Sequence, residues 1–307
     1  MVAILAGTVV VVVVWSLARR DADGVRFRPA VEAVVTAAES ERVVLVGEMH
    51  QWSEEHRFLR ELVGDPALRD VVDDVVVEFG NARYQPIVDA YVRGDPVDLA
   101  QLSRAWTDTT QGTVWLAPDY AAFFRAIREQ NRRFDRGRQL RVVLGDPPIR
   151  RRDPATLDFW VIQRDIHFAY VVQREVVARG RRALVIAGVG HVLRRPAPFP
   201  TLANLLEGSV DCSPDPAAVA AGVNWCDDLA RFAPVRVHVV VPHVGFQGRP
   251  ELEQRLEAAG RPSVVAIEGT WLAELPVATV LAESGDQGRW TLADAADDYL
   301  LLPGAGG

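Results

Sequence analysis

Residues 43–50 read Val-Val-Leu-Val-Gly-Glu-Met-His, and residues 183–191 read Ala-Leu-Val-Ile-Ala-Gly-Val-Gly-His. Each stretch is a run of apolar, strand-forming residues that ends in Gly-x-x-His. Runs this uniformly apolar are typical of strands in a sheet that is covered on both faces. The carboxyl ends of parallel strands meet at one edge of the sheet, where open α/β proteins bind ligands. The two stretches therefore predict an α/β fold with two imidazoles at a common edge.

The rest of the chain alternates apolar strand candidates with amphipathic stretches. Helices are predicted at residues 26–40, from residue 53 to about 63, and over a long segment from about residue 154 to 179. Because more than a dozen residues separate the strands, right-handed crossovers and a mainly parallel sheet are expected. No composition break marks a second domain, so we expect one α/β domain over residues 25–307, with helices flanking the sheet. Strands are predicted at residues 42–46, 74–79, 140–144, 183–187, 235–241, 264–267 and 299–302.

Residues 1–24 form a separate hydrophobic segment, uncharged and apolar from Val2 to Ala18. About 17–25 apolar residues are needed to span a bilayer, so the segment is at the lower limit. It predicts either a membrane anchor or an export signal, and hence a location in the cell envelope. Arg19 and Arg20 favour keeping the rest of the protein in the cytoplasm, and no basic region precedes the apolar run, which argues against cleavage. The sequence leaves the side of the membrane open.

The two cysteines, Cys212 and Cys226, flank a stretch rich in proline, alanine and aspartate. Two interpretations stand side by side. The pair forms a disulfide that closes an exposed insertion in an oxidising compartment, which stabilises a loop of this size by about 3 kcal/mol, or the two are unrelated thiols. The disulfide would favour export, in tension with Arg19 and Arg20.

Ionisable residues gather at the predicted carboxyl ends of five strands. Packing gives no reason for this, because burying such groups without partners costs several kcal/mol. The set suits two chemistries. One is a divalent metal (Zn, Mn, Co or Fe) that lowers the pKa of a bound water toward ~7. The other is metal-free catalysis with His50 as general base and Glu48 or Glu78 orienting its ring. The residues are Glu48, His50, Glu78, Asp146, His191 and His243.

The order and spacing of these motifs resemble a superfamily that contains erythromycin esterases, ChaN-like haem-binding proteins and TraB/Tiki proteases. The resemblance covers most of the chain from Val43 to Leu302 and is closest to the ChaN-like branch. Residues 44–50 resemble the family's first Gly-Glu-x-His strand end, and residues 75–79 its glutamate strand. Residues 186–192 resemble its second strand with histidine, and residues 163–165, Gln-Arg-Asp, are similar to its Arg-Asp helix.

The resemblance implies active-site or ligand roles for Glu48, His50, Glu78 and His191. The Tiki branch implies metal-dependent peptide cleavage, and the erythromycin esterase branch implies a histidine base that activates water. The erythromycin esterase branch has threonine and glycine on either side of its histidine, where this chain has Met49 and Gln51. This difference argues against macrolide esterase activity. The ChaN branch implies haem binding, with side chains that the resemblance does not identify here.

We therefore expect a hydrolase of an ester or peptide bond that acts on a small-molecule or peptide substrate, with the N-terminal segment at a membrane. Both divalent-metal-dependent and metal-free catalysis fit this expectation. His50 and His191 would bind a metal or activate water, Glu48 and Glu78 would complete the site, and Arg164 would stabilise an oxyanion. The alternatives are a non-catalytic haem-binding protein at the membrane and an inactive scaffold. A net charge of −7 excludes nucleic acid as the main partner. The candidate metal ligands are His50, His191, Glu78, Asp146 and His243.

The remaining histidines and aromatic residues have simpler interpretations. His56 and His167 fall on predicted helices and are expected at the surface or in packing, and His238, in mid-strand, is expected in the core. Arg164 and Asp165 suit a structural ion pair as well as a site role. Large aromatic residues are usually core residues, and the alternative is that some line a substrate cleft or a haem face. These aromatic residues are Trp106, Trp115, Tyr120, Trp160 and Trp225.

Overall fold

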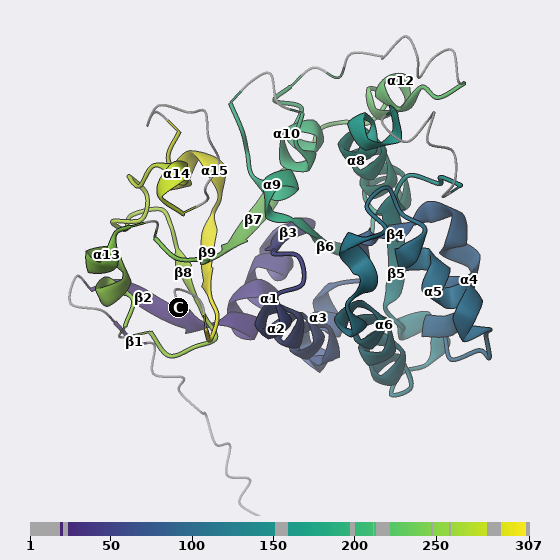
Figure 1. Ribbon diagram of the computed structural model, residues 1–307, viewed down its shortest axis with the longest axis horizontal. Helices are drawn as coiled ribbons and strands as arrows, with labels where there is room; N and C mark the ends of the chain where they lie inside the picture. The colour runs from purple at the N-terminus through teal and green to yellow at the C-terminus, as the bar shows by residue number, and fades with distance from the viewer. Residues whose placement is uncertain are drawn as a thin grey trace, which may run out of the picture.

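The computed structural model describes residues 19–20, 24–150, 159–196, 200–210, 212, 222–246, 248–257, 259–280 and 290–304. Across these residues, nine strands form one sheet in the order β1-β2-β8-β9-β7-β3-β6-β4-β5 (Figure 1). The strands from β9 to β5 pair in parallel, whereas β8, β2 and the two-residue β1 are added antiparallel at one edge. The predicted α/β fold with a mainly parallel sheet is confirmed.

Seven of the strands in the described residues agree with the sequence prediction to within two residues at either end. The added pair, β1 and β2, was not predicted. The bounds are β1 (Arg19–Arg20), β2 (Arg26–Pro29), β3 (Val43–Glu48), β4 (Asp74–Asn81), β5 (Arg141–Asp146), β6 (Ala183–Gly188), β7 (Val237–Pro242), β8 (Ser263–Ala266) and β9 (Asp298–Leu301).

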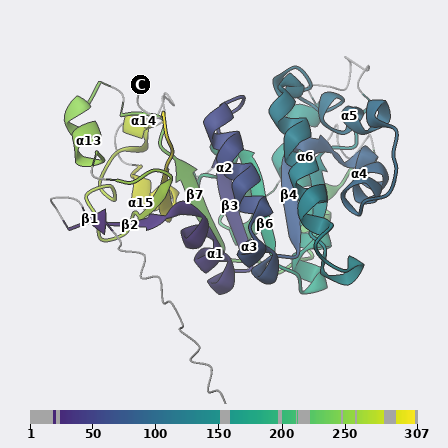
Figure 2. The same cartoon turned by 90° about the horizontal axis from the view of Figure 1, so that it is seen from below.

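Helices cover both faces of the sheet, as Figures 1 and 2 show. One face packs against α1 (Ala30–Ser40), α2 (Ser53–Gly64), α3 (Pro66–Val71), α4 (Gln85–Val92), α5 (Leu99–Thr107) and α6 (Pro118–Asn131). The other face packs against α8 (Arg164–Glu175), α9 (Val189–Val192), α10 (Leu202–Glu207), α12 (Trp225–Leu229), α13 (Pro250–Arg255), α14 (Val277–Val280) and α15 (Leu292–Ala295). Short 3₁₀ helices lie at η1 (Ala82–Tyr84), η2 (Val114–Leu116), η3 (Arg136–Arg138) and η4 (Val177–Arg179).

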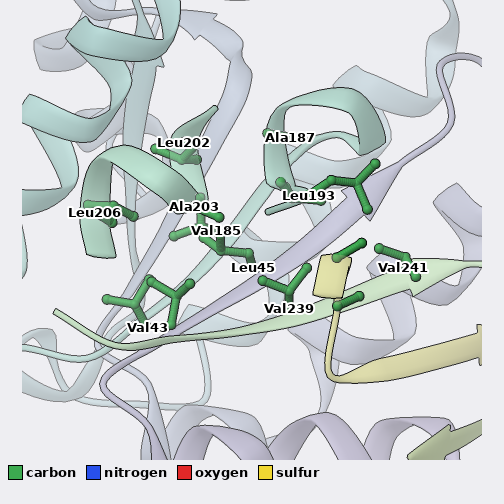
Figure 3. Packing of buried hydrophobic residues seen from close by; sticks show 14 of the residues in the cluster. Val43, Leu45, Val185, Ala187, Leu193, Leu202, Ala203, Leu206, Val239 and Val241 are labelled. Carbon is green, nitrogen blue, oxygen red and sulfur yellow. The ribbon is translucent and has the colours of Figure 1, made fainter. Parts of the chain in front are cut away.

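Strand β3 contributes to both hydrophobic cores because successive side chains point to opposite faces of a sheet. Val43 and Leu45 pack into the core on the α8 side, which Figure 3 shows. Val44 and Val46 pack into the core on the α2 side. All six residues of β3 are buried, so the strand that leads to Glu48 and His50 is held from both sides.

Two predicted helices differ from the structure. Residues 26–40 divide into β2 and α1, because a proline disfavours helical backbone in the residue before it and Arg28 instead pairs with Val264 of β8. The predicted helix over residues 154–179 is interrupted in its described part. Residues 159–162 are helical, Gln163 is a turn, and α8 then ends at Glu175, before η4.

Cys212 and Cys226 form a disulfide with their Cα atoms 5.4 Å apart, which decides between the two interpretations above. The predicted apolar segment from Val2 to Ala18 lies outside the described residues. Among the helices that the structure does describe, none has the length and apolar character to cross a bilayer. The division into an N-terminal segment and an α/β domain stays a prediction.

Candidate functional site

The two imidazoles of the Gly-x-x-His motifs meet at Gly188, the last residue of β6. Strands β3 and β6 are neighbours, and Glu48 is in register with Gly188. A Cβ atom on Gly188 would lie 2.9 Å from Cε1 of His50, 3.2 Å from Oε2 of Glu78 and 3.3 Å from Cδ2 of His191. Both rings and one carboxylate therefore converge on a single glycine, at the edge of the sheet predicted from the strand ends.

His50 forms a dyad with Glu48. Nδ1 of His50 lies 2.5 Å from Oε2 of Glu48, so in the neutral ring Nδ1 donates to the carboxylate and Nε2 keeps its lone pair. The ring packs edge-on against Trp115, with centroids 4.6 Å apart, and is about one-third exposed (33%). Burial opposes the charged ring, but the hydrogen bond and charge of Glu48, with the charge of Glu78, raise the pKa of His50 above its ordinary value. This combination is typical of a general base.

The other carboxylate oxygen of Glu48 is held by two residues on the α2 side of the sheet. Nε2 of His56 lies 2.9 Å from Oε1 of Glu48, and the Tyr120 hydroxyl donates to the same oxygen at 3.0 Å. Burial opposes ionisation of Glu48, yet the hydrogen bonds from His50 and His56 lower its pKa. His56 is buried, as a packing residue would be. Its ring also contacts Glu48, so it is part of the site as well.

Glu55 adds a second buried carboxyl near Glu48. Its Oε2 accepts a hydrogen bond from the Met49 amide at 2.6 Å. Burial, together with the charge of Glu48, raises the pKa of Glu55 well above its ordinary value. The shifts of the two neighbouring carboxyl groups therefore have opposite directions: the pKa of Glu55 is raised, whereas that of Glu48, the partner of His50, is lowered.

Glu78 and Arg164 lie on the other side of Gly188. The Gly188 amide donates to Oε2 of Glu78 at 2.6 Å, and Nη1 of Arg164 lies 3.3 Å from Oε1 of the same carboxylate. Both residues are buried, so the ion pair is shielded from water and from screening by salt. The pair places the guanidinium of Arg164, from the beginning of α8, next to Glu78 at the centre of the site.

His191 is held by residues from α8 at both ring nitrogens. Arg164 donates from Nη2 to Nε2 of His191 at 2.5 Å, and Nδ1 of His191 therefore donates to Oδ1 of Asp165 at 2.7 Å. Burial and Arg164 oppose the charged ring, but Glu78 and Asp165 outweigh them and raise the pKa of His191. His191 thus positions the guanidinium, and both of its ring nitrogens are engaged within the protein.

The loop between α5 and α6 contacts each part of this arrangement. The Gln111 amide faces Arg164 and, with its oxygen turned inward, accepts from Nη2 at 3.1 Å. Gln51, which has a φ of 65°, donates from its side chain to the Val114 carbonyl at 2.9 Å. A non-glycine residue with positive φ is strained and is often found at functional sites. The loop therefore fixes the backbone after His50 as well as the guanidinium.

Asp146 is near the site but bonded to the same loop. Its carboxylate accepts from the Thr110 amide at 2.9 Å and from the Thr110 hydroxyl at 2.5 Å. Burial raises the pKa of Asp146 to about 7, although the bonds from Thr110 lower it. Asp146 holds the loop in place and points no oxygen at the imidazoles.

His243 does not join the other predicted residues. Its Nδ1 lies 2.7 Å from the Tyr299 hydroxyl and its Nε2 lies 2.9 Å from Oε2 of Glu253, so its buried ring links β7 to β9 and α13. His167 is buried and its Nδ1 donates to the Gly145 carbonyl at 2.8 Å, which agrees with the packing role predicted for it. His238, expected in the core, is partly exposed and lies 3.0 Å from Oδ2 of Asp298.

The predicted metal set is not assembled. Among the described residues, no group of three or more His, Cys, Asp or Glu side chains is placed to hold a metal ion. The guanidinium of Arg164 lies where Glu78 and His191 would otherwise meet a cation. A second positive charge at this point would be repelled, so the residues do not fit a metal between these two ligands.

A hollow of about 350 Å³ opens beside His191. It is of the size of small-ligand pockets. Asp165 and His191 line it and belong to the arrangement described above. The lining residues are Val161, Ile162, Asp165, Gly190, His191, Arg195, Pro200 and Thr201.

Comparison with known proteins supports the resemblance. Residues 34–135 match the family model described as haem-binding uptake, Tiki superfamily, ChaN. The match covers about a third of the chain and includes Glu48, His50 and Glu78 but neither Arg164 nor His191. No curated protein matches the sequence.

Three solved structures are among those similar to the chain. A Bacillus cereus protein solved as a structural genomics target has a TM-score of 0.53 at 12% identity, over 89% of this chain and 90% of that chain. A mutant of the erythromycin esterase EreC in its open conformation has a TM-score of 0.50 at 13% identity, over 90% and 94%. ChaN of Campylobacter jejuni, described with cofacial haem binding, has a TM-score of 0.42 at 14% identity, over 70% and 86%. The first two likenesses show a shared fold.

Proposed function

We propose that the protein is a metal-independent hydrolase of ester bonds, with amide bonds as the related alternative. The observation that carries the proposal is the pairing of a base with a buried cation. Among the described residues, Nε2 of His50 has no partner, and Nδ1 contacts the Glu48 carboxylate. The ring lies across Gly188 from the Glu78–Arg164–His191 group. The shared fold with an erythromycin esterase adds support.

The first step is attack of water on the carbonyl carbon of the substrate. Nε2 of His50 accepts a proton from the water as the new C–O bond forms, and Glu48 stabilises the imidazolium through Nδ1. The carbonyl electron pair moves onto oxygen, and Arg164 supplies the positive charge for that oxyanion. His50 then returns the proton to the leaving oxygen as the bond to it breaks.

His56, Tyr120 and His191 act as positioning residues in this scheme. His56 and Tyr120 keep Glu48 ionised and directed at His50. His191 and Asp165 hold the guanidinium of Arg164 from the opposite side. Removing a general base or an oxyanion donor costs about 10²–10³ in rate, so either group is open to measurement.

The test is turnover of p-nitrophenyl esters and of a peptide library by the purified full chain. His50→Ala and Arg164→Gln should each lose about 10²-fold or more in kcat while circular dichroism and Tm show a folded protein. His238→Ala is the matched control, because His238 lies outside the site, and it should keep wild-type turnover. Hydrolysis that survives in folded His50→Ala would rule out the proposed base.

Haem binding is the second candidate function, and the family model over residues 34–135 favours it. His191 does not suit haem iron, because both of its nitrogens are engaged. His50 suits it better, since Nε2 has no partner among the described residues and the ring is partly exposed. A Soret titration with haem separates the candidates: a stoichiometric band that disappears in His50→Ala, without esterase activity in the wild type, would support binding.

A further inference from the structure

The hollow beside His191 has an aliphatic surface. Val161 is 41% exposed and Ile162 is 67% exposed, and Pro200 and Gly190 add apolar lining. Only four large hydrophobic side chains are exposed in the described part of the chain, and these are two of them. Exposed aliphatic side chains that line a hollow favour an apolar ligand, since its binding removes their surface from water.

The polar residues of the hollow are engaged within the protein. Asp165 accepts from His191, and the Thr201 hydroxyl is bonded to Asn204 at 2.9 Å. The guanidinium carbon of Arg195 lies 5.8 Å from the ring centroid of Trp290. A ligand in the hollow would therefore gain more from the aliphatic side chains than from new hydrogen bonds.

A third exposed aliphatic side chain lies at the other end of the site. Leu116 is 63% exposed and directly follows Trp115, whose ring contacts His50. Aliphatic surface thus flanks the two imidazoles at His191 and at His50. The fourth, Leu99, lies at the beginning of α5, at the far end of that helix from the loop that carries Trp115.

We infer that the hollow beside His191 binds the aliphatic acyl group of an ester substrate. The inference rests on the proposed hydrolase and names its substrate class. The hollow and the site share His191 and Asp165, so a group bound in the hollow would contact two residues of the proposed site. A volume of about 350 Å³ suits a short to medium chain and does not require a macrocycle.

The experiment is a series of p-nitrophenyl esters from acetate to octanoate, assayed with wild type, Ile162→Asp and Leu99→Asp. Each methylene group buried in the hollow should raise kcat/KM about fourfold until the hollow is full. Ile162→Asp should lower kcat/KM for the hexanoate ester by about tenfold or more and change the acetate ester little. Leu99→Asp places the same charge on an equally exposed leucine away from the site and should match the wild type.

A binding measurement separates the hollow from the chemistry. Alkyl methyl ketones of the same chain lengths, which are not hydrolysed, should bind the wild type more tightly as the chain grows, by calorimetry, and Ile162→Asp should abolish that trend. Hydrolysis of no ester by the wild type would overturn the proposed function. Hydrolysis of all esters at one rate, with length-independent ketone binding, would overturn the acyl site and leave the hydrolase standing. Equal losses in Ile162→Asp and Leu99→Asp would also overturn it.

Discussion

Gly188 leaves the space in which His50 lies: a Cβ atom on Gly188 would stand 2.9 Å from Cε1 of the His50 ring and 3.2 Å from Oε2 of Glu78. The glycine is needed for close approach, since its φ is not in the left-handed region. A single methyl group at residue 188 would therefore disturb the site, although Gly188 has no side chain that takes part in catalysis.

Gly188→Ala should displace His50 and lower kcat by about tenfold or more, with a stability cost of about 1–3 kcal/mol from overpacking. Gly64→Ala is the control, because nothing lies within 4 Å of the Cβ position there, and it should change neither quantity. Kinetics and urea unfolding of both variants check the prediction. Wild-type kcat in Gly188→Ala would mean that His50 is not held as described.

Activity should rise with pH through the pKa of His50 and then stay level. The proposed base works only when neutral, and Glu48 and Glu78 raise the pKa of its ring against the effect of burial. Glu48→Gln removes the first of these charges, so the midpoint of the kcat/KM profile should move to lower pH while the plateau falls. A midpoint that stays in place would show that Glu48 does not act on the titrating group.

Tyr120→Phe and His56→Phe should lower kcat by about tenfold each and leave KM nearly unchanged. Each removes one hydrogen-bond partner from Oε1 of Glu48, which costs about 1–3 kcal/mol when the acceptor is buried. In the Glu48→Gln background the same changes should have little further effect, because all three act through one carboxylate. Additive losses in the double variants would contradict this arrangement.

Removing metal should not change the activity. The guanidinium of Arg164 lies between Glu78 and His191, where a cation would be repelled. Dialysis against EDTA should therefore leave kcat unchanged, and elemental analysis should find no stoichiometric transition metal. Arg164→Lys keeps the charge but loses the planar donors that bind Glu78 and His191 together, so it should still lose most of the activity. Zinc-dependent recovery after EDTA would contradict the proposal.

Acid should destabilise the fold between about pH 6.5 and pH 4 through His167. Burial lowers the pKa of its ring from 6.5 to about 4, so in this window the unfolded chain binds more protons than the folded one. Stability is then complete above the ordinary pKa and falls as the pH decreases, by about 3 kcal/mol for this group. His167→Gln should reduce that fall in urea unfolding experiments at pH 7 and pH 4.5.

The strands and their functional ends could be predicted because burial on both faces leaves an unmistakable apolar run. Glu48, His50, Glu78 and His191 follow such runs, and the topology brings all four together. His243 also follows one, yet its ring turns toward Tyr299 and Glu253. The position of a residue at a strand end predicts the edge of the sheet at which it lies, but it does not predict the direction of its side chain.

The partners of His56 and Asp165 illustrate what the sequence left open: Asp165 was expected either to pair with Arg164 or to serve the site, and it contacts His191. His56 and Asp165 both lie on helices, where the identity of the buried partner depends on how the helix docks on the sheet. His56 is one turn into α2, and its buried side faces Glu48 and not only aliphatic residues. The position of the polar His56 on the apolar face of α2 could have indicated from the sequence that it has a buried polar partner. The sequence placed Arg164 at the site but did not show its contacts: the guanidinium binds Glu78 and His191, two of the predicted metal ligands.

The position of β6 between β3 and β4 has a consequence for synthesis. Strands β3 and β4, which end at or lead to Glu48, His50 and Glu78, leave the ribosome about a hundred residues before β6, the strand that joins them in the sheet. Such long-range pairing makes folding slow. Until β6 is made, the edges of β3 and β4 that face each other across it have no partner strand.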